Sequence, residues 1–284
     1  MSDAKPIIDR DKFEIFAAGL DHPECCAFSR DGTLWAGGEA GQIYRIDPKG
    51  TVEKIADLGG FVGGVAFSPK DELYACVPMH GVVHVSKNGK WDVVASEASG
   101  KKILTPNYGV FDRAGNYYVT DSGQWMKQNG SLIRITPDGK ATIIAGPFGY
   151  ANGLALSADE RTLFMVESNM NRVFRFELNE EGSVAKQSVY GEDVGRLPDG
   201  LCLDADGNLY VSCYASDDIH RISPDGTKAL FAYDHWAILL SRPTNMAFGG
   251  ENFDQMYVAN LGRMAITRAV VGVRGQRLAN QVGE

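Results

Sequence analysis

One pattern of apolar and polar positions returns six times along the chain. A short apolar run is followed by an acidic or glycine-containing turn and then by a second apolar run rich in Leu, Tyr and Val. The first copy reads ECCAFSRDGTLWAGG and the fifth reads DGLCLDADGNLYVSC. The copies begin at positions 24, 63, 107, 152, 199 and 245, so the period is 39 to 47 residues. Self-similarity at this period indicates an array of similar units.

Each copy is followed by two further short runs, for example GQIYRIDPKG and then TVEKIADL after the first. Runs rich in β-branched and aromatic residues, separated by D-G, N-G or P-D-G, are typical of strands joined by hairpin turns. Four strands in a repeat of about 40 to 45 residues are the signature of a propeller blade. The sequence therefore predicts an all-β, six-bladed β-propeller with four antiparallel strands per blade, and a single domain over residues 1–284.

The ends of the chain provide a way to close the ring. After position 245 only three β-like runs remain, NMAF, QMYVAN and MAITRAVV. The segment KFEIFAAG precedes the first repeat and has the same character. We expect this N-terminal strand to join the last blade, which would also protect sheet edges that are prone to aggregate.

Composition narrows the range of partners. Asp and Glu total 36 against 28 Lys and Arg, for a formal net charge of −8, which argues against nucleic acid or an anionic membrane as the main partner. No apolar run reaches the ~18 residues of a membrane helix, and the charged N-terminus lacks the apolar stretch of a secretory signal. We therefore expect a cytoplasmic protein, monomeric or weakly homo-oligomeric. The five cysteines include no C-x-x-C pair and lie in or beside apolar runs, so we expect free, buried thiols.

The residue that begins each copy is the candidate for chemistry, because the first strand of a blade lines the central channel. These positions hold two carboxylates, three carboxamides and one glycine: Glu24, Gly63, Asn107, Asn152, Asp199 and Asn245. Two buried carboxylates without a basic partner repel each other unless a cation lies between them. Oxygen ligands without sulfur or imidazole favour Ca²⁺, Mg²⁺ or Mn²⁺ over structural Zn²⁺. The alternative is that these groups bind backbone donors at the strand starts.

Several phrases resemble those of a known family. HPECCAFSRDG is similar to E-G-P-x-W-x-P-D-G, and TPNYGVFDRAGNYYVTD is similar to R-P-N-D-x-x-x-D-x-x-G-x-x-x-x-T-D. YANGLALSADE matches an A-N-G-L-x-x-S-x-D phrase, and LPDGLCLDADG matches P-D-G-x-x-x-D-x-x-G. Together they resemble the senescence marker protein/gluconolactonase/luciferin-regenerating family of regucalcin-like six-bladed propellers, over nearly the whole chain.

The resemblance implies a metal held by Glu24, Asn152 and Asp199, often with water or Asn107. It also implies that Asp199 acts as general base and that Asn107 contacts substrate. Ca²⁺ is the first candidate, with Mg²⁺, Mn²⁺, Zn²⁺ or Fe²⁺ as alternatives. Two departures from the family pattern argue against gluconolactone as the substrate. Thr105 stands where the sugar-lactone hydrolases often carry arginine, and Cys25-Cys26 replaces the usual Gly-Pro.

Further residues are candidates for the substrate site. Thr105, Asp121 and Trp125 are predicted to contact substrate, with turn capping as the alternative for Asp121. The walls of the channel mouth are predicted to be apolar, which favours an aromatic or alkyl lactone or ester, and the candidates are Trp125, Phe148, Tyr150, Met170, Tyr214 and Trp236. Segment 234–243 is expected to form a lid or short helix, and His22 to orient Glu24.

The leading hypothesis is a divalent-metal-dependent hydrolase of a lactone or related small ester. The cation would polarise the carbonyl group or lower the pKa of water, and Asp199 would accept the proton. One alternative is a phosphotriester or fluorophosphate hydrolase using the same metal site. The other is a non-catalytic propeller that binds calcium or a ligand.

Overall fold

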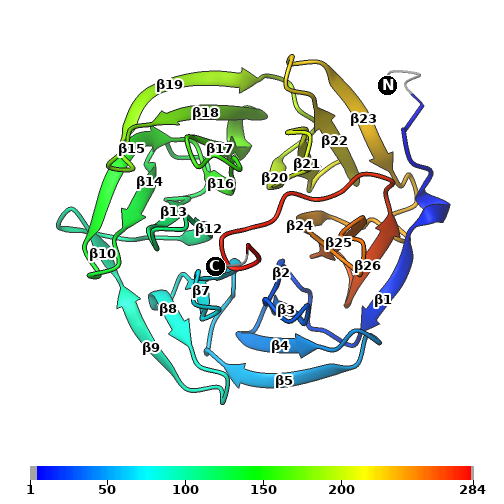
Figure 1. The fold of residues 1–284 in the computed structure, drawn as a ribbon, viewed down its shortest axis with the longest axis horizontal. Coiled ribbons are helices and arrows are strands. Elements are labelled where there is room, and N and C mark those ends of the chain that lie inside the picture. The colour runs from blue at the N-terminus through cyan, green and yellow to red at the C-terminus, as the bar shows by residue number, and fades with distance from the viewer. Residues whose placement is uncertain (1–4, 283–284) are drawn as a thin grey trace.

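The computed structural model describes residues 5–282, which form six four-stranded antiparallel sheets arranged in a ring (Figure 1). The first three blades consist of β2 (Cys25–Phe28), β3 (Leu34–Gly37), β4 (Gln42–Ile46), β5 (Val52–Asp57); β6 (Gly64–Phe67), β7 (Leu73–Val77), β8 (Gly81–Val85), β9 (Trp91–Ala95); and β12 (Pro106–Phe111), β13 (Tyr117–Asp121), β14 (Gly130–Ile135), β15 (Ala141–Phe148). The six-bladed, all-β prediction is confirmed.

The remaining strands follow the same order from the channel outward. They are β16 (Ala151–Leu156), β17 (Thr162–Glu167), β18 (Arg172–Leu178), β19 (Val184–Gly191); β20 (Pro198–Leu203), β21 (Leu209–Cys213), β22 (Asp218–Ile222), β23 (Lys228–Tyr233); and β24 (Pro243–Gly249), β25 (Gln255–Asn260), β26 (Ala265–Val270), β1 (Glu14–Ala18). Minor elements are β10 (Glu97–Ala98), β11 (Lys101–Lys102), η1 (Arg10–Lys12) and η2 (Ser168–Met170).

The recurring acidic turn joins the first two strands of a blade. In blade 5 the carboxylate of Asp204 accepts the backbone N–H groups of Asp206 and Asn208, and Gly207 adopts a φ of 82° that favours glycine. The same carboxylate also accepts the hydroxyl of Tyr210, at 2.9 Å. The turn is therefore specified by local hydrogen bonds, which is why its sequence returns in each blade.

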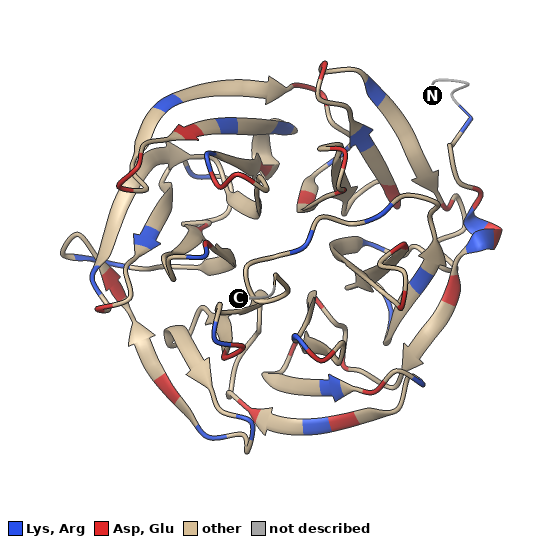
Figure 2. Ribbon diagram, viewed as in Figure 1, with Lys and Arg blue, Asp and Glu red and all other residues tan. Residues whose placement is uncertain are grey.

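Blades are held together by apolar clusters that cross from one sheet to the next. One cluster joins Cys25 and Trp35 of blade 1 to Val65 and Phe67 of blade 2. The rings of Trp35 and Phe67 meet edge to face, with centroids 6.1 Å apart. Charged residues lie mostly on the turns and outer strands (Figure 2). Each blade therefore needs its neighbours to bury its two faces.

The N-terminal strand closes the ring as expected. Strand β1 pairs antiparallel with β26, so the last sheet has the order β1-β26-β25-β24. The side chains of Glu14 and Arg268 form an ion pair of 2.7 Å across this seam. Within residues 5–282, no helix is long and apolar enough to cross a bilayer. The five cysteines are free; Cys25, Cys26, Cys76 and Cys213 are buried, and Cys202 is partly buried.

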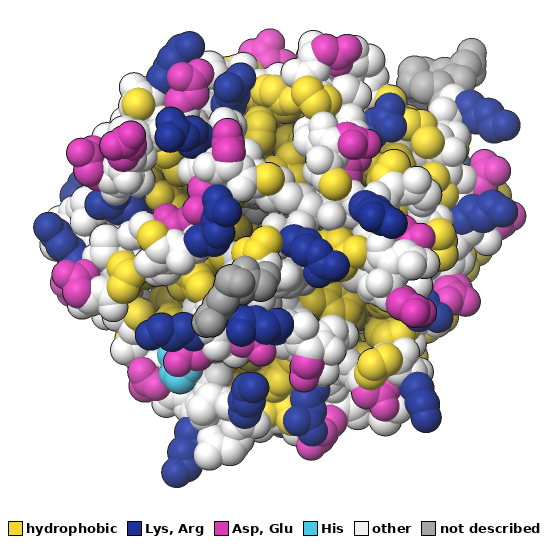
Figure 3. Space-filling view, in the orientation of Figure 1, with side chains coloured by type: hydrophobic (Ala, Val, Ile, Leu, Met, Phe, Trp, Pro, Cys, Tyr) yellow, Lys and Arg dark blue, Asp and Glu magenta, His cyan; other side chains and the backbone are white. Residues whose placement is uncertain are grey.

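The C-terminal tail (residues 271–282), which the sequence did not reveal as a structural element, crosses the ring of blades and covers one end of the channel (Figure 1). Gln276 contacts two blades, because its backbone N–H donates to Leu203 O and its side chain donates to Leu156 O. The buried side chain of Asn280 donates to Phe28 O at 3.0 Å. Figure 3 shows this face, on which basic and acidic side chains are interspersed. The tail thus ties together blades that are distant in sequence.

We expect Asn280→Ala to lower the free energy of unfolding by about 1–3 kcal/mol, because the buried carbonyl of Phe28 would lose its donor. Thermal unfolding would measure this as a fall in Tm. Asn252→Ala is the matched control, because Asn252 lies on the same face and is exposed. Equal Tm values for the two variants would contradict a stabilising role of the tail.

Candidate metal centre and substrate pocket

The six residues that begin the repeats converge at the end of the channel opposite to the tail. All six line one small, narrow cavity, together with Tyr108, Gly153, Gly200 and Thr244. Glycine after the channel residue allows this convergence. A Cβ atom on Gly153 would overlap the carbonyl oxygen of Asp199, and one on Gly200 would overlap that of Thr244. The N-G and D-G steps therefore let neighbouring inner strands approach each other closely.

We call the six repeat-starting residues that line this cavity the ring, as distinct from the ring of blades. Its two carboxylates share an environment that disfavours their ionised forms. Burial is the main cause that raises the pKa of Glu24 well above its usual range, and the charge of Asp199 adds to it. Burial also raises the pKa of Asp199 to about 8, against the lowering effect of a hydrogen bond from Asn152. No lysine or arginine among residues 5–282 lines this cavity or the wider cavity beside it. The ring therefore lacks a positive charge of its own.

The hydrogen bonds separate residues that serve the backbone from residues that remain available. Asn245 follows the backbone alternative, because its Oδ1 accepts the N–H of Cys26 at 3.3 Å. The Nδ2 group of Asn152 donates to Ser168 Oγ at 3.1 Å. Glu24 is 6% exposed, and its Oε2 atom has no hydrogen-bond partner. An unpartnered buried carboxylate oxygen beside a second carboxylate and an amide fits the donor set of a hard divalent cation.

A wider cavity of about 320 Å³, partly open to solvent, lies next to the ring. It shares Glu24, Asn107, Asn152 and Asp199 with the ring, and its walls are otherwise mainly apolar: Phe61, Trp125, Tyr150, Leu197, Tyr214 and Leu261, with Ser168 as a polar member. We call this cavity the mouth. The structure thus brings the predicted channel residues and Trp125 together.

The backbone that carries the walls of the mouth is strained at two positions, and hydrogen bonds hold it in place. Tyr150 and Leu197 have positive φ angles of 66° and 50°, a conformation that costs a non-glycine residue about 1–3 kcal/mol. The side chain of Asn171 accepts the N–H of Leu197 at 2.9 Å, and Tyr214 N–H donates to Leu197 O at 3.0 Å. The ring of Trp125 packs edge to face on Tyr150, with centroids 4.8 Å apart. These contacts hold an aromatic surface over the ring.

Phe61, Leu197 and Leu261 line the mouth but were not predicted from the sequence. Phe61 and Leu197 each stand two residues before the start of a repeat, as Tyr150 does. Reading that position in every blade would have found them, because equivalent positions in a propeller face the same end. Leu261 directly follows β25 and carries no comparable signal.

Thr105 and Asp121 lie beside the mouth but do not line it. The carboxylate of Asp121 accepts the backbone N–H groups of Leu104, Thr105 and Gly123. Thr105 Oγ1 donates to Gly123 O at 2.7 Å. These hydrogen bonds correspond to the capping alternative for Asp121 and fix the segment that leads into Asn107. Substrate contact by Thr105 and Asp121 stays a prediction.

Three of the six predicted wall residues do not line the mouth. Phe148 packs in the interior against Phe174, with ring centroids 5.3 Å apart. Met170 and Trp236 are exposed, at 49% and 68%. Met170 lies in η2 and Trp236 in the loop after β23.

Two further expectations were wrong. His22 does not contact Glu24, because its Nδ1 atom lies 2.9 Å from Asp21 Oδ1 and 3.4 Å from Glu39 Oε2. Segment 234–243 contains no helix, and none of its residues lines the mouth. The buried carboxylate of Asp234 instead accepts the backbone N–H groups of residues 236 and 238–240, which holds the segment as an irregular loop.

Comparison with known proteins agrees with this fold and geometry. The chain is 26% identical over 84% of its length to a 6-deoxy-6-sulfogluconolactonase of Pseudomonas putida, of which the alignment covers 82%. It is 33% identical over 51% of its length to lactonase drp35 of Staphylococcus saprophyticus, and spans less than half (46%) of that protein. A calcium-binding protein, regucalcin, from Agrobacterium tumefaciens superposes with a TM-score of 0.78 at 18% identity, covering 96% of this chain and 98% of that one.

A family model described as the SMP-30/Gluconolactonase/LRE-like region matches residues 22–261. The matched range contains every residue of the ring and of the mouth walls. The distant relatives of this chain include lactonases, as the resemblance implied. The chain belongs to the SMP-30/gluconolactonase/LRE-like family.

Proposed function

We propose that this protein is a divalent-cation-dependent hydrolase of lactones or related small esters. The observation that carries the proposal is the unpartnered, buried Oε2 atom of Glu24, which faces a ring containing a second carboxylate and no basic side chain. Removing two carboxylates from water without a counter-charge is costly. A bound divalent cation offsets that cost. The lactonase relatives favour acyl hydrolysis as the reaction.

The side chains have separate roles in this proposal. Glu24, Asn152 and Asp199 hold the cation, with Ca²⁺ as the first candidate. When bound, the cation supplies Lewis-acid stabilisation of the negative charge that develops on the carbonyl oxygen. Asp199, at the base of the mouth, accepts the proton of the attacking water. Asn107 faces the mouth and positions the substrate through its amide.

The mouth favours an aryl or alkyl lactone over a charged sugar lactone. Trp125 and Tyr150 present an aromatic surface, and no lysine or arginine within the described chain lines the cavity to pair with a sulfonate or carboxylate. Arg242, the cation next to Tyr214, is engaged with that side chain, because its Nη1 donates to the Tyr214 hydroxyl at 3.1 Å.

The direct test is removal and restoration of the cation. The protein would be stripped with EDTA and supplied singly with Ca²⁺, Mg²⁺, Mn²⁺, Zn²⁺ or Fe²⁺, while acid release is followed on sugar, alkyl and aryl lactones and on a phosphotriester. Hydrolysis of an aryl or alkyl lactone that returns with one cation supports the proposal. Cation binding without turnover of any substrate would indicate a binding protein, and turnover of the phosphotriester alone would replace the lactone as substrate.

Cation binding is expected to release protons and to strengthen with pH. The raised pKa values of Glu24 and Asp199 mean that the cation-free pair retains a proton at neutral pH. Because the folded-state pKa of Asp199 lies above the unfolded one, the stability that Asp199 contributes is complete below about pH 4 and is lost as pH rises through 8. Calorimetry in buffers of different ionisation enthalpy would detect proton uptake by the buffer at pH 6.5 and much less at pH 9. Equal proton release at both values would contradict the prediction.

The aromatic wall is expected to determine substrate preference. Trp125→Ala should raise KM for an aryl lactone by about tenfold, the effect of losing roughly 1.4 kcal/mol of aromatic contact. Trp236→Ala is the matched control, since Trp236 is exposed and lies outside the mouth. Steady-state kinetics on aryl and small alkyl lactones would compare the two variants. A KM unchanged in Trp125→Ala for every lactone would remove Trp125 from the substrate site.

A further inference from the structure

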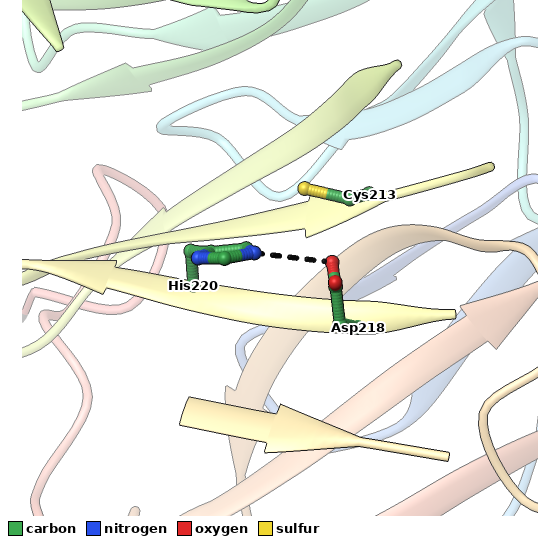
Figure 4. Close-up of side chains that lie close together, drawn as sticks. All are labelled: Cys213, Asp218 and His220. Carbon is green, nitrogen blue, oxygen red and sulfur yellow. Dashed lines mark ion pairs between the residues drawn. The ribbon is translucent and has the colours of Figure 1, made fainter. Parts of the chain in front are cut away.

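A second cluster of potential ligands lies in blade 5, away from the oxygen-only ring. Cys213 is the last residue of β21, Asp218 is the first residue of β22, and the two residues are paired across the strands. His220 stands two residues further along β22 and so projects from the same face as Asp218. One ligand atom from each of the three side chains lies within 4.8 Å of the others. Figure 4 shows the three side chains converging above the two strands.

The present contacts of this cluster leave its ligand atoms largely available. The Nε2 atom of His220 is buried and has no hydrogen-bond partner, although Asp218 Oδ1 lies 3.3 Å away. The thiol of Cys213 is fully buried and makes two long contacts, of 3.6 Å to Val194 O and 3.9 Å to Val211 O. Asp218 Oδ1 accepts the hydroxyl of Ser216 at 2.9 Å.

Backbone close to the cluster is shaped to leave room for the sulfur. Gly195 lies directly over it, and a Cβ atom there would overlap Cys213 Sγ and lie 3.1 Å from the His220 ring. Gly195 also has a positive φ of 61°. The segment between β19 and β20 therefore covers the cluster with its smallest possible residue.

The separation of the nitrogen and oxygen ligands fits a tetrahedral ion. Zinc binds imidazole nitrogen and carboxylate oxygen at about 2.0 Å and thiolate at about 2.3 Å. Tetrahedral angles then place nitrogen and oxygen about 3.3 Å apart, which is the separation of His220 Nε2 and Asp218 Oδ1. Thiolate and imidazole ligands select zinc-like ions over Ca²⁺ and Mg²⁺. The chemistry of this cluster thus differs from that of the ring.

We propose that Cys213, Asp218 and His220 form a second metal site, which takes a zinc-like transition-metal ion and is separate from the ring. Binding displaces the thiol proton of Cys213 to solvent and leaves a fourth coordination position for water. The ion joins β21 to β22 beneath the segment that carries Leu197, and Tyr214 directly follows Cys213. Because both neighbours are walls of the mouth, the site stabilises the substrate pocket without contacting substrate.

The electrostatics of the cluster agree with this assignment. Burial, and then the charge of Asp218, raise the pKa of the Cys213 thiol well above its usual range. A thiolate next to a carboxylate therefore needs a cation to exist. An ion pair between His220 and Asp218 alone would be the simpler explanation, but it would leave the sulfur without a role.

The test uses Co²⁺, which reports its ligands by absorption. The full chain, reduced and stripped with EDTA, is titrated with Co²⁺. We expect an intense sulfur-to-cobalt charge-transfer band in the near ultraviolet and tetrahedral d–d bands in the visible, both removed by one equivalent of Zn²⁺. The ring and the Asp21–His22–Glu39 cluster contain no sulfur, so binding there would give no charge-transfer band.

Four variants make the assignment specific. Cys213→Ser should abolish the charge-transfer band, and His220→Gln should weaken Co²⁺ binding at least about tenfold. Cys202→Ser is the matched control on the neighbouring strand β20 and should retain the band, as should Glu24→Gln, which keeps failure of this site distinct from failure of the ring. Absence of a charge-transfer band in the native chain, its persistence in Cys213→Ser, or undiminished affinity in His220→Gln would overturn the proposal.

Discussion

Glu24→Gln is expected to abolish cation-dependent turnover and cation-induced stabilisation together, while raising the Tm of the cation-free protein. The substitution keeps the shape of the side chain but removes a buried carboxyl group whose Oε2 atom has no partner. The amide cannot ionise, whereas burial and then the charge of Asp199 penalise the ionised form of Glu24 and so raise its pKa. Tm should rise by about 2–4 °C for each kcal/mol gained. Thermal unfolding with EDTA and with Ca²⁺, together with lactone hydrolysis, would measure these effects.

The opposite directions of these effects make the prediction specific. A residue with only a structural role would lose stability when altered, with or without a cation. Glu180→Gln provides the control, because Glu180 is exposed between β18 and β19 and lines neither the ring nor the mouth. A Glu24→Gln protein that retains cation-induced stabilisation or full activity would exclude Glu24 as a metal ligand.

Asp199→Asn is expected to lower turnover by about 10²- to 10⁴-fold, the usual contribution of a general base. Asparagine keeps an oxygen for the cation but cannot accept a proton. The fall should therefore appear mainly in kcat, with a smaller change in cation affinity than in Glu24→Gln. Measurement of kcat across pH would give a second test of the general-base role, since the acidic limb of the native profile should disappear in the variant.

The matched control for Asp199 is Asp206→Asn. Asp206 belongs to the same blade, but it is exposed on the turn between β20 and β21 and lies outside the mouth. We expect native kinetics from this variant. A native kcat in Asp199→Asn would assign the proton transfer to another group and leave Asp199 as a ligand alone.

Much of the fold could be read from the chain because its rules are local. Alternating apolar residues and acidic Gly turns fix a hairpin within about ten residues, as the carboxylate of Asp204 does for the turn to Asn208. Repetition of that hairpin then predicts the number of blades, and a missing fourth strand predicts closure by β1. The C-terminal tail escaped prediction because it forms no strand and binds blades distant in sequence through residues such as Gln276 and Asn280.

The candidate site likewise has features that could be predicted from the sequence and features that could not. Glu24, Asn152 and Asp199 could be placed together because equivalent positions of a repeat face the same end of the channel. The sequence could not show that Asn245 serves a backbone donor while the Oε2 atom of Glu24 remains unpartnered. That distinction depends on which strand start lies next to which backbone group, and hence on contacts across the ring.

The sequence by itself thus determined the blades, their closure and the set of residues at the channel, since period, turn chemistry and repetition are properties of short segments. Only the tertiary structure decided which channel groups remain free, which aromatic residues form the mouth, and that Cys213 meets His220 across two strands. These outcomes depend on packing between residues that no local pattern connects. The electrostatic cost at Glu24 and Asp199 is of this kind, because two carboxylates 175 positions apart share one buried space.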